Sequence, residues 1–261
     1  MAATPKKSLG QHWLTDRLVL AEIADTAKLD ASDTVLEIGP GLGTLTSELL
    51  RRANRVVAVE IDASLAAKLP GQFPGKDLEV INGDFMDYDL GKLPKNYVVV
   101  ANVPYYITSR ITQRLLTAAN RPKRIVMLIQ KEVAERMAAP SGEMSLLSLS
   151  AQLFAKVSLG QTVSAEYFTP PPKVDSQVVV LDLFAERPYD QATEREFFRL
   201  AKAGFSARRK KLRSSLAGGL GLSKDDTERL LLGSGIDPNL RAEALSVEQW
   251  QALFANFRGQ N

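Results

Sequence analysis

The sequence has no cysteine and a single histidine, His12, among its 261 residues. Without cysteine the chain can form neither disulfides nor zinc–thiolate sites, and it has no thiol nucleophile. One histidine argues against a histidine-based metal centre and against a catalytic triad of the Ser-His-Asp kind. We therefore expect no metal at the functional site.

The sequence also lacks long hydrophobic runs, internal repeats and low-complexity tracts. No apolar stretch approaches the ~20 residues that a membrane-spanning helix needs, and residues 1–7 lack the apolar core of a signal peptide. We therefore expect a cytoplasmic protein with no membrane partner. A hydrophobic content of 45% with 24% charged residues is ordinary for a globular protein, and the length suits one large domain with a small one.

An apolar run over residues 97–101 is followed by Asn102, Val103, Pro104 and Tyr105, a form of the Asn-x-Pro-Tyr motif of amino-group methyltransferases. The run is rich in β-branched residues and short, which predicts a buried parallel strand that ends in a tight loop. In open α/β sheets the ligand crevice lies beyond the carboxyl ends of the strands, where this loop falls.

The chemistry of an exocyclic aromatic amine explains these residue types. Its lone pair is delocalised into the ring, so the amine is a poor nucleophile. The Asn102 side-chain oxygen and the backbone carbonyl of Val103 can accept hydrogen bonds from its two N–H groups and hold the lone pair toward an incoming methyl group. Pro104 fixes φ and aims that carbonyl, while the Tyr105 ring offers a face to a flipped-out base. The four residues alone also fit a structural loop with a packed tyrosine.

Three strands are predicted before this motif, over residues 34–38, 55–59 and 78–81. The glycine turn Gly39-Pro40-Gly41-Leu42-Gly43 and a helix follow the first strand, so the backbone can approach a ligand closely and the helix N-terminus favours an anionic group. Glu60 ends the second strand and suits vicinal ribose hydroxyls, and Asp84 follows the third and suits an adenine amine. Taken singly, the turn also fits a dinucleotide, and each acid fits a solvent-facing loop. Together they predict one cofactor site.

The rest of the first 185 residues continues the α/β pattern. Helices are expected over residues 17–27, 109–117 and 131–137 and from residue 146, and strands over residues 123–129, 153–163 and 176–184. The connection before the last strand is too short for a crossover helix, so the last two strands should pair antiparallel. Residues 4–16 are expected to form an extended strap, followed by a helix that Thr15 or Asp16 caps and that buries Leu18, Leu20, Ile23 and Ala24.

Beyond Pro188 the pattern is wholly helical, and helices are expected over residues 193–204, 209–216, 224–233 and 247–257. This division predicts an α/β domain over residues 1–185 and a small all-helical domain over residues 186–261. The helical domain is expected to have a core of its own, made by Phe197, Phe198, Leu200, Phe205, Leu212 and Leu216.

Basic residues cluster in the helical part, where residues 197–224 contain eight of them and no acidic residue. The densest stretch supplies the candidate RNA-binding residues Arg208, Arg209, Lys210, Lys211 and Arg213. A charge run is often only a solvated face, but an apolar face accompanies this one, so we predict contact with nucleic acid. Lys6 and Lys7 fit either a phosphate contact or solvated terminal charges.

Five segments in register along the chain carry a family resemblance, namely Gly10–Leu14, Glu37–Gly43, Asn102–Tyr106, Pro171–Ser176 and Phe205–Arg213. They resemble the small-subunit ribosomal RNA adenine dimethyltransferases of the KsgA type. The resemblance implies a Rossmann-like S-adenosylmethionine-dependent domain followed by a small helical domain. It also implies dimethylation of the N6 amines of two adjacent adenosines near the 3′ end of small-subunit rRNA. The expected partner is that rRNA or an immature small ribosomal subunit, and we expect a monomer.

The resemblance further implies the cofactor-binding residues, which are His12, Leu14, Gly39, Gly41, Glu60, Ile61, Asp84, Phe85 and Asn102. Asn102 would be shared between the cofactor and the target base. The family usually has Asn-Phe where this chain has His12-Trp13, so an imidazole replaces a side-chain amide. Val103 replaces the more usual Leu or Ile, which changes little because its carbonyl is the group in use.

Other functions fit part of the pattern. The macrolide-resistance type of large-subunit rRNA adenine methyltransferase shares the fold and the Asn-x-Pro-Tyr motif, but residues 205–213 and Leu245-Ser246 resemble the small-subunit enzymes better. A non-catalytic assembly factor with this fold predicts damage at Gly39, Glu60 or Asn102, and all three are intact. A dehydrogenase leaves the Asn102 loop unexplained. DNA and protein-glutamine methyltransferases fit the basic helical domain less well.

Overall fold

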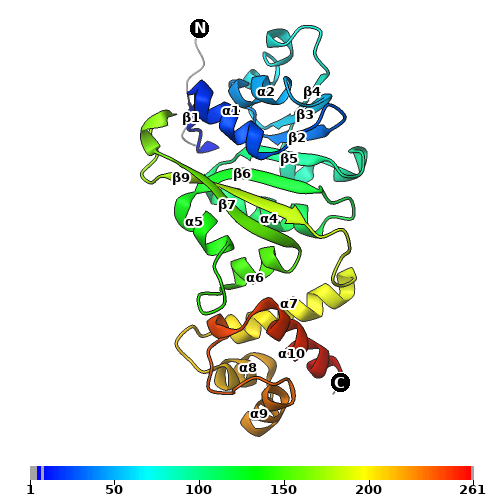
Figure 1. Cartoon of the computed structure of the whole chain (residues 1–261), viewed down its shortest axis with the longest axis vertical. Helices are drawn as coiled ribbons and strands as arrows, with labels where there is room; N and C mark the ends of the chain where they lie inside the picture. The colour runs from blue at the N-terminus through cyan, green and yellow to red at the C-terminus, as the bar shows by residue number, and fades with distance from the viewer. Residues whose placement is uncertain (1–4, 7–8, 260–261) are drawn as a thin grey trace. The chain divides into compact units, whose positions relative to one another are not determined.

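The computed structural model describes residues 5–6 and 9–259, which form two compact units. Unit 1 comprises the described residues up to Glu135 together with Ala155–Ala185. Unit 2 comprises Arg136–Phe154 and the chain from Glu186 onward. The chain therefore passes into the second unit at 185/186, where the sequence places a boundary, and it also makes an earlier excursion into that unit over residues 136–154 (Figure 1).

Unit 1 is built on a seven-stranded sheet with the order β4-β3-β2-β5-β6-β9-β7 (Figure 1). Its strands are β2 (Thr34–Ile38), β3 (Arg55–Glu60), β4 (Leu78–Asn82), β5 (Val98–Asn102), β6 (Arg124–Gln130), β7 (Ala155–Val163) and β9 (Ser176–Leu183). The first five pair in parallel, and β9 pairs antiparallel with both β6 and β7. The expected α/β class and the antiparallel pairing of the last two strands are both confirmed.

The central strands are buried because they are continuous β-branched runs covered on both faces. Val98, Val99, Val100 and Ala101 of β5 have no exposed surface. The edge strand β4 is partly exposed along its length. Since β2, β3, β4 and β5 run in parallel, their carboxyl ends lie along the same edge of the sheet.

The N-terminal segment is tied down by a separate two-stranded sheet, in which β1 (Trp13–Leu14) pairs antiparallel with β8 (Phe168–Thr169). The helix α1 (Arg17–Thr26) follows, and Asp16 caps it by accepting hydrogen bonds from two backbone N–H groups at 3.0 Å. This confirms the predicted cap.

The prediction of the buried face of α1 is wrong at one residue, Leu18. Leu20, Ile23 and Ala24 are buried, but Leu18 is 76% exposed. At about 100° per residue, Leu18 lies roughly 160° from Leu20 around the helix, so it faces away from the core that the other three join.

The remaining helices of unit 1 are short. They are α2 (Thr44–Leu49), α3 (Ala63–Ala66), α4 (Thr108–Thr117) and the first residues of α5 (Lys131–Met137), with the 3-10 helices η2 (Pro70–Gln72), η3 (Phe85–Asp87), η4 (Leu90–Lys92), η5 (Tyr105–Ile107) and η6 (Ala165–Tyr167). The helix α4 buries Ile111, Leu115 and Leu116 and carries polar residues on its opposite face.

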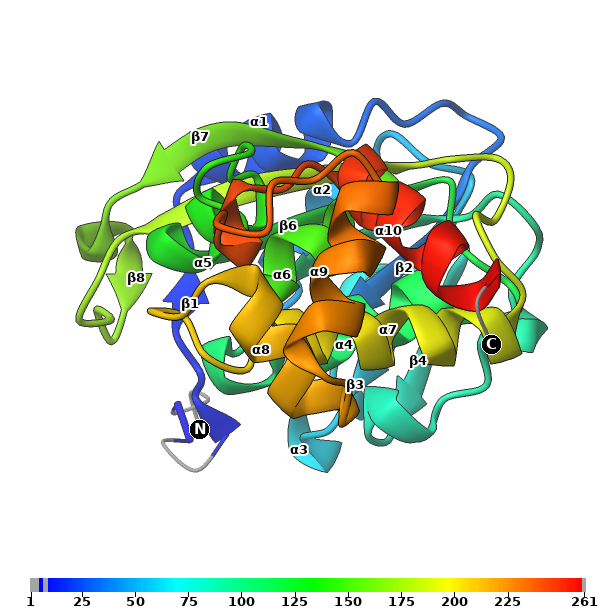
Figure 2. The same cartoon turned by 90° about the horizontal axis from the view of Figure 1, so that it is seen from below.

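Unit 2 is helical throughout its described part, and Figure 2 shows its last four helices gathered together. Its elements are α6 (Leu146–Gln152), α7 (Gln191–Phe205), α8 (Leu212–Leu220), α9 (Lys224–Gly233), η7 (Ala242–Ala244) and α10 (Val247–Gly259). The expected core is confirmed for Phe197, Leu200, Leu212 and Leu216, while Phe198 and Phe205 are only partly buried. Trp250 and Phe254 of α10 complete it.

The start of α8 differs from the expected helix over residues 209–216. Residues 208–210 form a turn, and the helix begins at Leu212. Lys211 has an extended backbone with φ −62° and ψ 147°, and the Leu212 N–H donates to the Leu240 carbonyl at 2.7 Å. This tertiary hydrogen bond replaces the helical one that the residue would otherwise make. Within the described residues, no helix is long and apolar enough to span a membrane.

Alanine substitutions at the two adjacent glycines of α8, Gly218 and Gly219, should have opposite effects on stability. A Cβ on Gly219 would lie 2.6 Å from the Ala203 Cβ and 2.7 Å from its Cα on α7, whereas a Cβ on Gly218 would meet nothing within 4 Å. Gly219→Ala should therefore lower the free energy of unfolding by about 1–3 kcal/mol through overpacking. Gly218→Ala should raise it by about 0.5–1 kcal/mol through higher helix propensity. Urea unfolding of the two variants checks both signs, and equal effects would contradict the close approach of α7 and α8.

Candidate functional site

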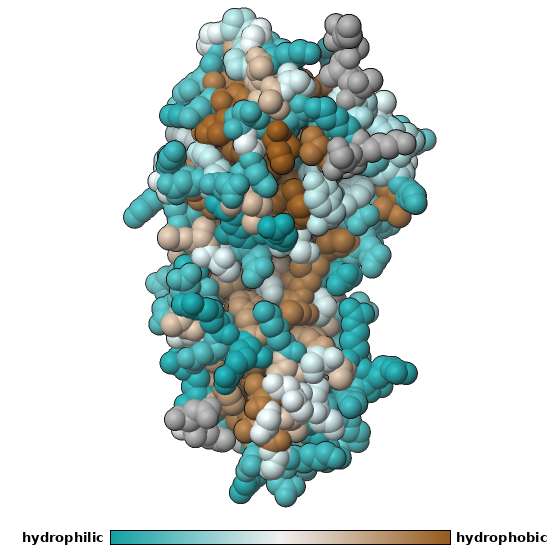
Figure 3. Space-filling view, turned by 180° about the vertical axis from the view of Figure 1, so that it is seen from behind, coloured by the Kyte–Doolittle hydropathy of each residue, from teal (hydrophilic) through white to brown (hydrophobic). Residues whose placement is uncertain are grey.

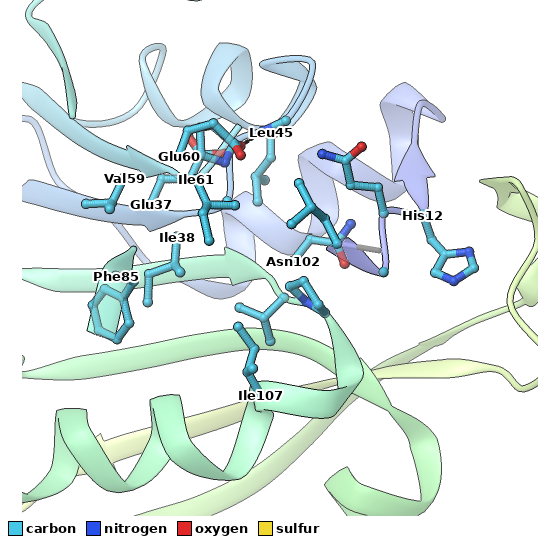
Figure 4. A pocket seen from close by; sticks show the side chains of 18 of the residues that line it. His12, Glu37, Ile38, Leu45, Val59, Glu60, Ile61, Phe85, Asn102 and Ile107 are labelled. Carbon is cyan, nitrogen blue, oxygen red and sulfur yellow. Dashed lines mark hydrogen bonds between the residues drawn. The ribbon is translucent and has the colours of Figure 1, made fainter. Parts of the chain in front are cut away.

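A pocket of about 230 Å³ opens at the carboxyl ends of the parallel strands of unit 1 (Figure 4). All predicted cofactor-binding and catalytic residues line it, namely His12, Leu14, Gly39, Gly41, Glu60, Ile61, Asp84, Phe85, Asn102, Val103, Pro104 and Tyr105. The structure therefore brings these side chains together around one cavity. Their individual roles stay predictions.

The glycine turn after β2 forms one wall of the pocket. Gly39, Gly41 and Gly43 have φ values of +69°, +59° and +81°, a region that other residues adopt at a cost. A Cβ on Gly39 would meet nothing within 4 Å. The missing side chain therefore leaves open space in which a ligand can approach the backbone.

Glu60, the last residue of β3, shapes that turn. The residue is 3% exposed, and its carboxylate accepts hydrogen bonds from the Gly41 N–H at 2.9 Å and from the Asp62 N–H at 2.8 Å. Each carboxylate oxygen has a further lone pair, so both can also accept from a ligand hydroxyl. A buried carboxylate held in place by two backbone donors suits recognition of a pair of neighbouring hydroxyls.

Apolar side chains and one acid form another part of the wall. Figure 4 shows Ile38, Ile61 and Phe85 on one side of the pocket, and Ile61 is 51% exposed despite its apolar side chain. Asp84 is exposed and accepts a hydrogen bond from the Met86 N–H at 2.8 Å through one oxygen. A slot of apolar side chains with a carboxylate beside it suits a flat ring that carries an amine.

The Asn102 loop presents unused acceptors to the pocket. Asn102 is partly exposed, and no described residue forms a hydrogen bond with its side-chain amide. The Val103 carbonyl likewise receives no hydrogen bond within the described part of the chain. Pro104 has φ −56° and ψ 135°, which sets the direction of the chain after that carbonyl. Two free acceptors next to each other can bind the two N–H groups of one amine.

Tyr105 is fixed by one contact of its hydroxyl and one contact of its ring. Its hydroxyl forms a 2.8 Å hydrogen bond with the Oγ of Ser176, which is fully buried at the start of β9. Burial raises the pKa of Tyr105 above its usual value, so the phenol stays neutral. The ring stacks on the His12 imidazole with centroids 6.1 Å apart and planes inclined by 15°.

The His12 imidazole contacts Pro170 and Tyr105 rather than the strand ends at Gly39 and Glu60. Its Nδ1 lies 2.7 Å from the Pro170 carbonyl, which can only accept, so Nδ1 carries the proton. Figure 4 shows the ring directed away from Glu60 and Leu45. The predicted contact of this residue with the cofactor stays a prediction, and the imidazole has a second function in holding β1 to the segment after β8.

Sequence reasoning missed several contacts in and beside the pocket. Phe168 is buried in the pocket wall because β8 pairs with β1, a pairing between segments more than 150 residues apart. Lys6 forms a 2.8 Å ion pair with the buried Asp62, and this contact lowers the pKa of Asp62 to about 2. Lys6 is therefore paired with a carboxylate and not merely solvated, and Lys7 lies outside the described residues. The Trp13 indole N–H is buried with no hydrogen-bond partner among the described residues.

The candidate RNA-binding residues lie in unit 2. Arg208, Arg209 and Lys210 are exposed in the turn before α8, and the exposed Lys211 donates to the Asn239 side chain at 2.8 Å. Arg213 is partly buried and lies 3.2 Å from the Glu228 carboxylate. The turn therefore presents several exposed positive charges, whereas Arg213, in α8, is already paired with a carboxylate.

The described residues contain no group of His, Asp or Glu side chains arranged to hold a metal ion.

Comparisons with known proteins add to this geometry. A family model described as ribosomal RNA adenine dimethylase matches residues 2–258. The ribosomal RNA small subunit methyltransferase A of Dehalococcoides mccartyi (strain CBDB1) is 44% identical over 260 residues, covering 97% of this chain and 89% of that protein. The solved dimethyladenosine transferase from Plasmodium falciparum has a TM-score of 0.84 and 29% identity, covering 95% of this chain and 98% of that one. The 23S rRNA methyltransferase ErmE has a TM-score of 0.76 and 30% identity, covering 94% and 99%.

Glu37 makes stability depend on pH. This pocket residue is 1% exposed and accepts one hydrogen bond, from Thr46 at 2.6 Å, and burial raises its pKa to about 8. The folded protein holds this proton more tightly than the unfolded chain does, so the free energy of unfolding should fall as the pH rises from about 4.5 to 8. Glu37→Gln removes the titration. The free energy of unfolding of the variant relative to the wild type should therefore rise over that window by a few kcal/mol, at about 1.4 kcal/mol per pKa unit.

Urea unfolding of wild type and Glu37→Gln at pH 5 and pH 8 measures this difference. Glu132→Gln, at an exposed glutamate of α5, serves as the control and should show the same difference at both pH values. A stability difference between wild type and Glu37→Gln that does not change with pH would show that Glu37 titrates normally.

Proposed function

The chain belongs to the ribosomal RNA adenine dimethylase family, and we propose that it dimethylates two adjacent adenosines near the 3′ end of small-subunit rRNA. Each adenosine receives two methyl groups on its N6 amine, with S-adenosylmethionine as the donor. Relatives named ribosomal RNA small subunit methyltransferase A support the choice of subunit, since their identity reaches 44% over nearly the whole chain. Such a substrate places the reaction in the cytoplasm, during ribosome biogenesis.

The pocket fits the proposed cofactor by its shape and its donor and acceptor groups. The open space at Gly39, the carboxylate of Glu60 and the acid Asp84 lie along the successive ends of β2, β3 and β4. We infer that Glu60 accepts from the ribose hydroxyls and that Asp84 accepts from the adenine amine. When bound, S-adenosylmethionine supplies an electrophilic methyl group on a sulfonium sulfur. Ile61 and Phe85 would cover the faces of the adenine ring.

The observation that carries the proposal is the pair of free acceptors at the Asn102 side chain and the Val103 carbonyl. We infer that they bind the two N–H groups of the target amine and localise its lone pair on nitrogen. The amine is neutral when it attacks, so no general base is needed before methylation; the nitrogen carries the positive charge after methyl transfer and then loses a proton to water. Tyr105, fixed by Ser176, would stack on the flipped-out adenine.

A large-subunit rRNA substrate is the second candidate, because the 23S rRNA methyltransferase ErmE has the same fold at 30% identity. Primer extension across the 3′ end of small-subunit rRNA, in cells with and without this protein, tests the choice. Stops at two adjacent adenosines that depend on the protein support the small subunit. Protein-dependent stops only in large-subunit rRNA would overturn the proposal.

Asn102→Ala tests the orientation mechanism. Loss of a preorganised acceptor at the reacting nitrogen should lower kcat by about 10²-fold or more at saturating cofactor. Methyl transfer to small-subunit rRNA measures the rate, and Asn54→Ala, which changes an exposed asparagine that does not line the pocket, provides a matched control for the substitution itself. A rate near that of the wild type in Asn102→Ala would exclude this mechanism.

The basic turn predicts a salt-dependent RNA interaction. Changing Arg208, Arg209 and Lys211 to glutamate should weaken RNA binding and flatten its dependence on salt, by up to about 0.9 log units for each phosphate that the variant no longer binds. The same charge change at Arg17, Lys92 and Lys95, which are exposed and do not line the pocket, is the control. Salt series of RNA binding compare the two triple variants. Identical slopes would show that the turn is only a solvated face.

A further inference from the structure

Tyr106 and Arg110 line the pocket but have no role in the mechanism above. Tyr106 follows Tyr105 in η5 and is 66% exposed, and Arg110 lies one helical turn later in α4 and is also exposed. Both line the pocket as well as facing solvent. They therefore form a rim where the pocket meets the surface, which we call the Tyr106–Arg110 rim. The face in Figure 3 shows other hydrophobic side chains of unit 1 exposed among hydrophilic ones, in the upper half of the view.

The Tyr106 ring is held in position by the N-terminal segment. Gly10, with φ +62°, packs against the ring so closely that a Cβ there would lie 3.3 Å from the tyrosine Cε1 and 3.5 Å from its Cδ1. The Pro104 Cβ would lie at 3.5 Å from the same point. The absence of a side chain at Gly10 thus lets the backbone support one part of the ring while most of its surface stays in water. A large exposed ring fixed by its neighbours is ready to stack with a ligand.

Arg110 forms no ion pair with a described residue, whereas Arg114, one turn further along the helix, is held by structural contacts. Within the described residues, no carboxylate lies within ion-pair distance of Arg110. Arg114 donates to the Tyr88 carbonyl, and its guanidinium lies 5.3 Å from the centre of the Phe85 ring. Arg114 therefore serves the structure, and Arg110 alone of the two is free to bind an anion.

We propose that the Tyr106–Arg110 rim binds the nucleotide next to the target adenosine, with its base stacked on Tyr106 and its phosphate paired with Arg110. The inference rests on the proposed function. Extruding one base leaves its neighbour without a stacking partner, and an aromatic side chain can replace that partner. In the proposed substrate the neighbour is the other adenosine to be methylated. The rim thus holds the second target while the first occupies the pocket.

The stacking is measured with an RNA hairpin in which 2-aminopurine replaces one of the two adjacent adenosines. Stacking on Tyr106 quenches its fluorescence, so wild-type protein should quench it on binding. Tyr106→Ala should lose the quenching and weaken RNA binding about tenfold, the effect of one base–aromatic stack. Tyr106→Phe, which keeps the ring, should retain the quenching. Tyr167→Ala, at a tyrosine that is 43% exposed and does not line the pocket, is the matched control.

The phosphate contact is measured by a salt series on the same RNA. Arg110→Gln should reduce the slope of log binding constant against log salt by about 0.7, the value for one contact to a single strand. Arg17→Gln, at an exposed arginine of α1 that does not line the pocket, should leave the slope unchanged. Cofactor calorimetry on both variants separates an RNA effect from a general change in the pocket.

The two hypotheses fail in different measurements. The proposed function fails if wild-type protein leaves small-subunit rRNA unmethylated. The inference about the rim fails if Tyr106→Ala quenches and binds the hairpin as the wild type does, or if Arg110→Gln keeps the wild-type salt slope. Binding and quenching require no turnover, so they test the rim whatever the outcome of the methylation assay.

Discussion

The parallel pairing of β2 with β3 on one side and β5 on the other is the constraint on which the site depends. Ile38 is in register with both Val59 and Ala101, so the next residues, Gly39, Glu60 and Asn102, end three strands at the same edge. Parallel strands place their carboxyl ends together by geometry, so Gly39 and Asn102 meet although they are more than 60 positions apart. A slip of one register position in β3 or β5 would turn the Glu60 or Asn102 side chain to the other face of the sheet.

A second set of contacts brings the far end of the sheet domain to the same pocket. Three contacts join the Asn102 loop or the N-terminal segment to residues 168–176. They are the pairing of β1 with β8, the His12 contact with Pro170 and the hydrogen bond between the Tyr105 and Ser176 hydroxyls. Binding and reacting groups need positions fixed to a fraction of an ångström, and rigid strands provide them better than loops do. The part of the pocket at Gly39 and Glu60 depends on the parallel strands, and the part at Tyr105 depends on these cross-links.

Sequence reasoning succeeds where a pattern is local and fails where partners are distant. Alternating or continuous apolar runs predict the strands, and strand ends followed by Gly39, Glu60 and Asn102 predict which residues share a pocket. The inward position of Phe168 and the ion pair of Lys6 with Asp62 depend on pairing between remote segments, which leaves no periodic trace. The start of α8 is set by the Leu240 carbonyl, and helix propensity cannot show such a bond.

The excursion of residues 136–154 into unit 2 has a consequence for synthesis of the protein. These residues leave the ribosome before β7 and β9 of unit 1 and before the rest of unit 2. Phe154, which stacks on Phe198 with ring centroids 6.2 Å apart, must therefore wait for its partner while a growing chain adds some 40 residues, or several seconds at about 5–20 residues per second. Unit 1 is complete in sequence at residue 185, whereas unit 2 can finish folding only after the chain beyond residue 186 is made, so nascent intermediates should expose this aromatic side chain to chaperones.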